Sequence, residues 1–261
     1  MAAMGAAFSK PTRRELIAGA AAALAVAGRG ACAAQSAPAM DRLIRAYPQF
    51  LQEANADAVR LRDNTLLPWD DGPNNKTFQQ KLDHASLADQ MSIPYVAGPV
   101  NSPPAVNQDP GRFRNLALFR KMYGDDESAV RRNLVPVTWN IGAYQGEMPF
   151  TSVNGVDKAI AAVVAELAQL PADLHKFLVP PSGSFNWRAI AGTGELSPHA
   201  FGIAVDINSD LSDYWRWEPS LAWKNRIPFA IVEIFERHHF IWGGKWYHFD
   251  TMHFEYRPEL V

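Results

Sequence analysis

The segment Glu195-Leu-Ser-Pro-His-Ala-Phe-Gly-Ile-Ala-Val-Asp-Ile-Asn208 guides the interpretation of the rest of the chain. Its second half alternates branched aliphatic residues with small or acidic ones, which is the pattern of a half-buried strand. The aliphatic residues of the expected buried face are Ile203, Val205 and Ile207. Asp206 then lies on the opposite face, seven residues after His199. Gly202 and Ala204 between them are too small to fill a site, so an imidazole and a carboxylate are expected near each other.

These two side-chain types are typical zinc ligands, and a catalytic zinc usually has three protein ligands and an open position for water. We expect the third ligand in Trp246-Tyr-His-Phe-Asp-Thr-Met-His-Phe-Glu255. This segment offers His248 and His253 as rival ligands. Strand alternation places His248 and Asp250 on one face and His253 on the other, unless a turn intervenes.

Two motifs occur in a fixed order along these segments. The first, Ser-x-His-x-x-x-Gly-x-Ala-x-Asp, consists of Ser197, His199, Gly202, Ala204 and Asp206. The second combines Trp-Gly-Gly-x-Trp with Asp-x-x-His-Phe and consists of Trp242, Gly243, Gly244, Trp246, Asp250, His253 and Phe254. Together they resemble the zinc peptidases of bacterial cell walls, the D-alanyl-D-alanine carboxypeptidase and L-alanyl-D-glutamate endopeptidase family. The close resemblance runs over residues 185–256. It implies an α+β fold with a small antiparallel sheet and flanking helices, shared with the Hedgehog signalling domain.

The resemblance also implies a metal site and a general base. Its zinc ligands are His199, Asp206 and His253, and Zn²⁺ held there would lower the pKa of a bound water to about 7. Asp250 matches the carboxylate that takes a proton from water and passes it to the leaving amine. His248 remains the rival metal ligand.

Three further residues receive roles. Arg188 is placed where the family has an arginine that stabilises the negative charge of the intermediate or binds a substrate carboxylate. A surface ion pair is its alternative role. Ser197 is expected to hydrogen-bond the substrate or to stabilise its own loop. Glu255 is expected to hydrogen-bond a metal ligand. A helix is predicted after Pro228, through Ile231 and Phe235 to about residue 238. His238 and His239 at its end are expected to be structural.

Residues 1–34 have the features of an export signal. Arg13-Arg14 forms a twin-arginine pattern, an uncharged alanine-rich run follows from Leu16 to Gly28, and small residues at 31–34 offer cleavage sites. The run is too short to span a bilayer. A disordered alanine-rich tail is the alternative. We expect a twin-arginine signal peptide, a periplasmic or extracellular mature protein, and no stable membrane anchor after cleavage. Cleavage would also remove Cys32, the only cysteine, and with it any sulfur ligand.

Residues 35–132 are predicted to form a helical and loop-rich N-terminal extension, and residues 133–261 the zinc peptidase core. In the extension, residues 41–62 suggest one or two amphipathic helices, and residues 64–115 contain many prolines and glycines. We interpret the latter segment as an ordered loop region that wraps the domain or rims its cleft. A short helix is expected over residues 112–123.

In the core, strands are predicted over residues 133–141, 185–190 and 253–256, and a hairpin turn over 242–246. The clearest helix covers residues 154–170. Its expected buried face consists of Val156, Ile160, Val163, Val164 and Leu167. The aromatic residues of segment 209–224 are expected to serve packing rather than ligand binding.

The leading hypothesis is an exported zinc metallopeptidase that acts on peptidoglycan stem peptides, as either a D-Ala-D-Ala carboxypeptidase or an L-Ala-D-Glu endopeptidase. A zinc amidase of the cell wall and a non-catalytic, zinc-stabilised cell-wall binding module are the alternatives. Asp250 and Arg188 favour an enzyme, because a purely structural zinc needs neither a base nor an open position. The chain has no basic run longer than two residues, so nucleic acid is not an expected partner. The oligomeric state is not predicted.

Overall fold

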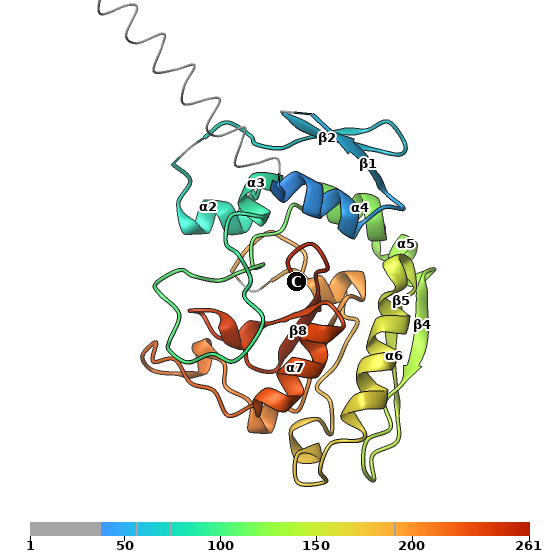
Figure 1. Cartoon of the computed structure of the whole chain (residues 1–261), viewed down its shortest axis with the longest axis vertical. Coiled ribbons are helices and arrows are strands. Elements are labelled where there is room, and N and C mark those ends of the chain that lie inside the picture. Colours follow the sequence, from blue (N-terminus) through green and yellow to red (C-terminus); the bar gives the residue numbers. More distant parts are fainter. Residues whose placement is uncertain (1–37, 56, 74, 191) are drawn as a thin grey trace, which may run out of the picture.

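The computed structural model describes residues 38–55, 57–73, 75–190 and 192–261. The predicted signal segment, residues 1–34, lies outside the described residues. The fold is α+β, as predicted, with three small antiparallel sheets and several helices. Figure 1 shows the elements of the extension gathered at one end of the long axis of the molecule, and α6, α7 and β8 toward the other.

The extension begins with a helix over 38–46 and then forms a three-stranded sheet. The strands are β1 (Leu51–Ala54), β2 (Ala58–Leu61) and β3 (Leu66–Pro68), paired in that order. The prediction of helix throughout residues 41–62 is therefore wrong in its second half. The side chain of Asn55 accepts hydrogen bonds from the backbone N–H groups of Asp57 and Ala58, which closes a turn that a helix cannot contain.

Short helices and a long loop complete the extension. The helices are α2 (Phe78–Asp83), α3 (Leu87–Gln90), α4 (Leu116–Tyr123) and α5 (Glu127–Arg131). Capping boxes formed by Thr77 with Gln80 and by Ser86 with Asp89 begin α2 and α3. The loop between α3 and α4 lies against the C-terminal part, where Lys245 donates hydrogen bonds to the carbonyls of Val96 and Gly98. The loop-rich segment therefore wraps the molecule.

A two-stranded sheet and the predicted long helix follow. Strands β4 (Leu134–Thr138) and β5 (Glu147–Thr151) are antiparallel, and α6 (Val156–Leu167) packs against them. The predicted strand over residues 133–141 and the predicted helix over 154–170 are confirmed in their central parts. The buried residues of α6 are those of the predicted face: Val156, Ile160, Val163, Val164 and Leu167.

The third sheet contains both motif segments. Its strands are β6 (Ala204–Asp206), β7 (Phe240–Trp242) and β8 (His253–Tyr256), with β8 in the centre, and α7 (Phe229–Arg237) precedes β7. Residues 185–190 form no strand, because they hydrogen-bond to the loop at 195–199 rather than to a sheet. The expected hairpin turn at 242–246 is a 3₁₀ turn, η6 (Gly243–Lys245). The other 3₁₀ turns are η1 (Val153–Gly155), η2 (His175–Phe177), η3 (Pro198–Phe201), η4 (Ser209–Leu211) and η5 (Trp215–Trp217).

One hydrophobic cluster contains residues from both predicted domains, from Met40 to Tyr256. Buried polar side chains join them as well: the Tyr47 hydroxyl and the Gln90 amide both donate to the carboxylate of Glu259, at 2.6 and 3.0 Å. The domain boundary at residue 132 stays a prediction, and the two sides of it share a core. Within the described part of the chain, no helix is long and apolar enough to cross a membrane.

Candidate metal centre

Strand register brings two of the predicted ligands together. In the antiparallel pair β6–β8, Asp206 lies directly opposite His253. His199 comes from η3, which ends at Gly202 in the left-handed conformation (φ 68°) just before β6. The three ligand atoms form a nearly equilateral triangle. His199 Nε2 lies 3.2 Å from His253 Nδ1 and 3.3 Å from Asp206 Oδ1, and His253 Nδ1 lies 3.0 Å from Asp206 Oδ1.

This triangle has the dimensions of a metal site. Metal–ligand bonds of about 2.0 Å in a tetrahedral arrangement separate the ligand atoms by about 3.3 Å. The protonation of His199 agrees with that role. Its Nδ1 lies 2.6 Å from the carbonyl oxygen of Ser184, which can only accept a hydrogen bond. In the neutral ring Nδ1 therefore carries the proton, and Nε2 directs a lone pair toward the other two ligands.

His253 is oriented in a similar way by Glu255. The Nε2 atom of His253 is buried without a hydrogen-bond partner among the described residues, and Glu255 Oε2 lies 3.5 Å from it. Glu255 was expected to hydrogen-bond a metal ligand. Its carboxylate does lie beside Nε2 of His253, but the separation of 3.5 Å is longer than a normal hydrogen bond. With the proton on Nε2, the Nδ1 lone pair faces Asp206. Three electron-rich atoms then meet about 3 Å apart, an arrangement that a bound cation relieves.

The pKa shifts of Asp206 and His253 also indicate that this group stabilises positive charge. Burial raises the pKa of Asp206, but the neighbouring His199 and His253 outweigh burial and hold this pKa far below its ordinary value. Burial lowers the pKa of His253, but hydrogen bonds with Asp206 and the proximity of Glu255 outweigh it and raise the pKa to about 9. The described residues His199, Asp206 and His253 form a group that could hold a metal ion.

Asp250 lies beside this group in a different environment. Its backbone N–H donates to the Gly243 carbonyl, and the N–H of His253 donates to the carbonyl of Asp250. This turn is what allows Asp250 and His253 to reach the same site despite their spacing. The Oδ1 atom of Asp250 is buried without a hydrogen-bond partner in the described structure. Burial and repulsion from Asp206 raise the pKa of Asp250 to about 6, against the opposing effect of the nearby cations.

A cleft of about 110 Å³ contains all the predicted site residues. Those that line it are His199, Asp206, His253, Asp250, Arg188 and Ser197. Arg188 is exposed and forms no ion pair with any described residue, so the surface ion pair considered for it is not observed. The hydroxyl oxygen of Ser197 accepts a hydrogen bond from the His199 N–H at 3.4 Å, which places it at the start of η3.

His248 lines the same cleft but is not grouped with the ligands. Its Nδ1 lies 2.7 Å from Oδ2 of Asp109, a fully buried carboxylate of the extension. The structure thus places His253, not His248, beside His199 and Asp206. Of the other histidines, His238 contacts Glu166 at 2.6 Å at the end of α7, as expected of a structural residue.

Among the residues around the cleft to which the sequence assigns no role are Asp109, Arg112, Arg114 and Trp215. The first three belong to the loop that was expected to rim the cleft, but nothing in their local pattern distinguished them. Trp215 belongs to the segment expected to serve packing; its side chain forms part of the cleft wall, and the expectation stays a prediction.

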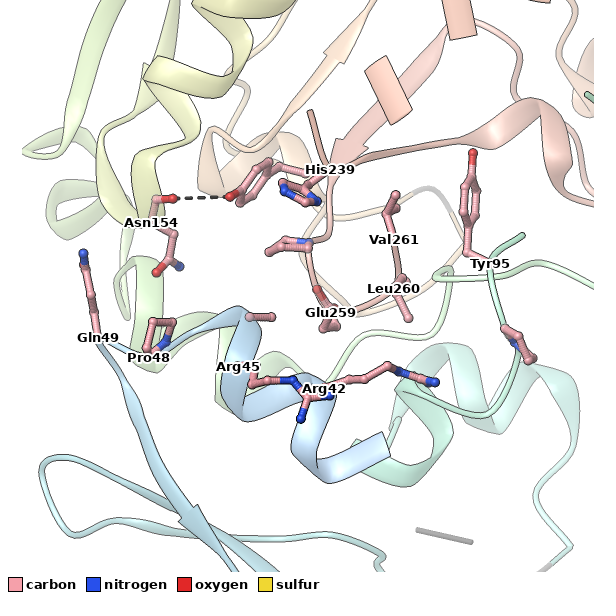
Figure 2. Close-up of a pocket in the computed structure, with 14 residues that line it drawn as sticks. Arg42, Arg45, Pro48, Gln49, Tyr95, Asn154, His239, Glu259, Leu260 and Val261 are labelled. Atoms are coloured by element: carbon pink, nitrogen blue, oxygen red, sulfur yellow. Dashed lines mark hydrogen bonds between the residues drawn. The ribbon is translucent and has the colours of Figure 1, made fainter. Parts of the chain in front are cut away.

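A larger cavity of about 570 Å³ lies away from the metal-binding group. Figure 2 shows it between Arg42 and Arg45 of the first helix and the end of the chain at Leu260 and Val261. The hydroxyl of Tyr256 donates to the Asn154 carbonyl at its edge (3.4 Å). None of the predicted site residues lines this cavity, so the reactive groups lie in the smaller cleft.

Comparison with known proteins agrees with this location. Residues 191–256 match the family model described as D-alanyl-D-alanine carboxypeptidase. The matched region contains the His-Asp-His group and Asp250, whereas Arg188 and the whole extension lie outside it. Comparisons with the curated proteins and with the solved structures give no match. The family match supports a peptidase of the D-alanyl-D-alanine carboxypeptidase type, with a His-Asp-His group that could bind a metal ion.

Proposed function

We propose that this protein is an exported zinc metallopeptidase that hydrolyses peptide bonds in the stem peptides of peptidoglycan. The observation that carries the proposal is the triangle of lone pairs from His199, Asp206 and His253 beside the buried carboxylate of Asp250. A structural metal site would have no use for such a carboxylate, because leaving it buried without a partner is costly. The family match at residues 191–256 supports the peptidase chemistry.

The residues of the cleft have complementary roles in hydrolysis. Zinc held by His199, Asp206 and His253 would supply a Lewis acid that lowers the pKa of water and polarises the scissile carbonyl. Asp250, with a pKa of about 6, is mostly ionised at neutral pH and accepts a proton from the attacking water. It then delivers this proton to the leaving amine. The guanidinium of Arg188 stabilises the negative charge that develops on the carbonyl oxygen.

The decisive experiment is digestion of purified muropeptides by the protein that starts at residue 35, with zinc analysis of the same sample and mass measurement of the products. Loss of a terminal D-alanine identifies a carboxypeptidase, and a cut between L-alanine and D-glutamate identifies an endopeptidase. Release of the entire stem from the sugar identifies an amidase instead. Zinc-loaded protein that binds peptidoglycan but cleaves no bond supports the binding module.

The export part of the proposal rests on Arg13-Arg14 and the apolar run that follows. Replacing both arginines by lysine should leave the uncleaved precursor inside the cell. Normal processing of that variant would show that another route exports the protein.

A further inference from the structure

A second compartment adjoins the metal cleft. It has a volume of about 130 Å³ and shares five lining residues with the cleft: Arg112, Arg114, Ile190, Trp215 and His248. Its far wall comes from α2, through Phe78, Gln79 and Leu82. Arg112 and α2 lie outside the region that matches the peptidase family. The extension therefore enlarges the cleft on one side with residues of its own.

Arg112 lies at the junction of the two spaces and is held in place by its neighbours. Its Nη1 donates to Asp109 Oδ2 at 2.6 Å, and its backbone carbonyl accepts a hydrogen bond from Arg114 at 3.0 Å. The guanidinium also lies over three aromatic rings. Its distances to the ring centres are 6.0 Å for Phe78, 5.9 Å for Trp215 and 5.8 Å for Trp246. A cation fixed in this way loses little conformational freedom when a ligand binds.

The charges of this compartment favour an anion. Asp109 is fully buried and satisfied, because it accepts hydrogen bonds from Arg112 and from the His248 backbone N–H, and its Oδ2 contacts the His248 ring. Nε and Nη2 of Arg112 donate to no other described residue, and 14% of the side chain is exposed. Across the compartment, the guanidinium of Arg216 lies 4.9 Å from the ring centre of Trp215. Arg112, Arg114 and Arg216 thus bring three guanidinium groups to the lining of this compartment, which includes no carboxylate of the described residues.

We propose that this compartment, which we name the Arg112 subsite, binds a free carboxylate of the stem peptide beside the scissile bond. The inference rests on the proposed function. The planar donor pair of a guanidinium matches the two oxygens of a carboxylate, whereas a carboxamide offers one oxygen and a mismatched NH₂ group. The rings of Phe78 and Trp215 cover the methylene groups that join the carboxylate to the peptide. The subsite thereby selects stem peptides that carry an acid, rather than an amide, at that position.

The test uses matched stem peptides in which one carboxylate at a time is replaced by its carboxamide. Wild-type kcat/KM should be roughly tenfold to a hundredfold higher for the acid than for the amide at one position, the range expected for a charge-assisted hydrogen bond. Arg112→Gln should bring that acid-to-amide ratio close to one. Arg132→Gln is the matched control: Arg132 is an exposed arginine outside the cleft, and its variant should keep the wild-type ratio.

The ratio distinguishes substrate binding from a purely structural role for Arg112. A structural defect lowers kcat/KM for acid and amide alike and leaves their ratio at the wild-type value, which would overturn the inference. Arg112→Lys keeps a positive charge beside Asp109 but lacks the paired donors, so it should fold and give an intermediate ratio. It replaces Arg112→Gln in the comparison if that variant does not fold.

Failure of the subsite can be separated from failure of the proposed function. Wild-type enzyme that cleaves acid and amide peptides equally well at every position is a peptidase without the Arg112 subsite. If the wild type cleaves no stem peptide, the proposed function fails, and the same peptides are compared by calorimetric binding. Equal affinities for acid and amide would then reject the subsite too, whereas tighter binding of one acid that Arg112→Gln removes would keep it.

Discussion

Asp206 and Asp250 are two carboxylates of one cleft with opposite environments. Asp206 lies between two imidazoles that keep its pKa far below the ordinary value, so it stays ionised as a ligand should. Asp250 is half-buried, its buried Oδ1 lacks a hydrogen-bond partner in the described structure, and its pKa is raised to about 6. Pairs of acidic groups with pKa values pushed apart divide the tasks of charge stabilisation and proton transfer.

Asp250→Asn should therefore separate catalysis from metal binding. The amide keeps the size of the side chain but cannot accept the proton, so turnover should fall by about 10²- to 10⁴-fold while zinc content stays near the wild-type value. His253→Ala should lose zinc and activity together. Zinc analysis and a stem-peptide assay at one neutral pH measure both. Unchanged turnover in Asp250→Asn would assign the base to another residue.

Arg114 is expected to position a metal ligand from a distance. It donates hydrogen bonds to both oxygens of Glu255, at 2.8 and 2.5 Å, and Glu255 in turn faces Nε2 of His253. Arg114→Lys keeps the charge but loses the paired geometry, so zinc should bind about 10- to 100-fold more weakly. Competition with a chromogenic chelator measures this affinity. Arg131→Lys, at an exposed ion pair with Glu127, should leave it unchanged.

At the scale of elements, the turn that joins η3 to β6 depends on Gly202. A Cβ atom there would lie 2.6 Å from Leu134 Cδ2 and 3.0 Å from the Thr151 nitrogen, and φ is 68°. Gly202→Ala should lower the free energy of unfolding by about 2–4 kcal/mol, from left-handed strain and overpacking combined. Gly155→Ala provides the control, because φ is 73° but no atom lies within 4 Å. Urea unfolding should show a cost of about 1 kcal/mol there; equal losses would contradict the packing argument.

The start of α3 should make stability depend on pH at the acidic end. Burial raises the pKa of Asp89, but hydrogen bonds from Lys76, Ser86 and Lys81 outweigh it and hold this pKa below its ordinary value. A carboxyl group with a lowered pKa in the folded state stabilises the fold above its unfolded pKa of about 3.9. That stability is lost as the pH falls through the folded pKa.

Asp89→Asn should accordingly be less stable than wild type at pH 7, by about 1–3 kcal/mol. The difference should shrink as the pH falls below about 4, because the carboxyl group of the unfolded wild-type chain then binds a proton that the folded state takes up only at lower pH. Urea unfolding of both proteins between pH 3 and 7 tests the prediction. A constant difference across that range would show that the charge of Asp89 does not stabilise α3.

Regular sequence patterns predicted some elements well and others not at all. The 3.6-residue period of α6 and the alternation of β6 were read correctly, because in each case one face is apolar and the other is not. Strand β7 was missed because Phe240, Ile241 and Trp242 are all buried and show no alternation. The sequence predicts a helix where β1 and β2 form a hairpin, because Phe50 and Leu51 also fit a helical spacing.

At the scale of the whole molecule, the site was predictable only where its residues lie within short motifs. His199, Asp206, Asp250 and His253 each belong to a recognisable local pattern. Arg112, Arg114 and Asp109 reach the cleft through contacts with residues about 140 positions later in the chain, such as Glu255 and His248. Contacts of this range follow from tertiary packing, which a single sequence does not display.

The shared core predicts that residues 133–261 do not fold by themselves. Without the extension, Glu255 loses Arg114, and Glu259 loses Tyr47 and Gln90. Removing one partner of a buried ion pair typically costs 3–5 kcal/mol, which approaches the total stability of a small domain. Near-UV circular dichroism should show tertiary structure in the protein that starts at residue 35 and none in the fragment. A cooperative thermal transition in the fragment would instead support an independent domain.

The opposition of Asp206 and His253 across β6 and β8 also determines where the chain tolerates insertions. The two residues are 47 positions apart, and most of that interval consists of loops and turns that can change length without moving either strand. Adding a single residue within β6 or β8 would turn every following side chain of that strand to the opposite face. Descendants of this gene can therefore lengthen an exposed loop between the strands, such as residues 219–226, but an insertion inside either strand removes the metal-binding group in one step.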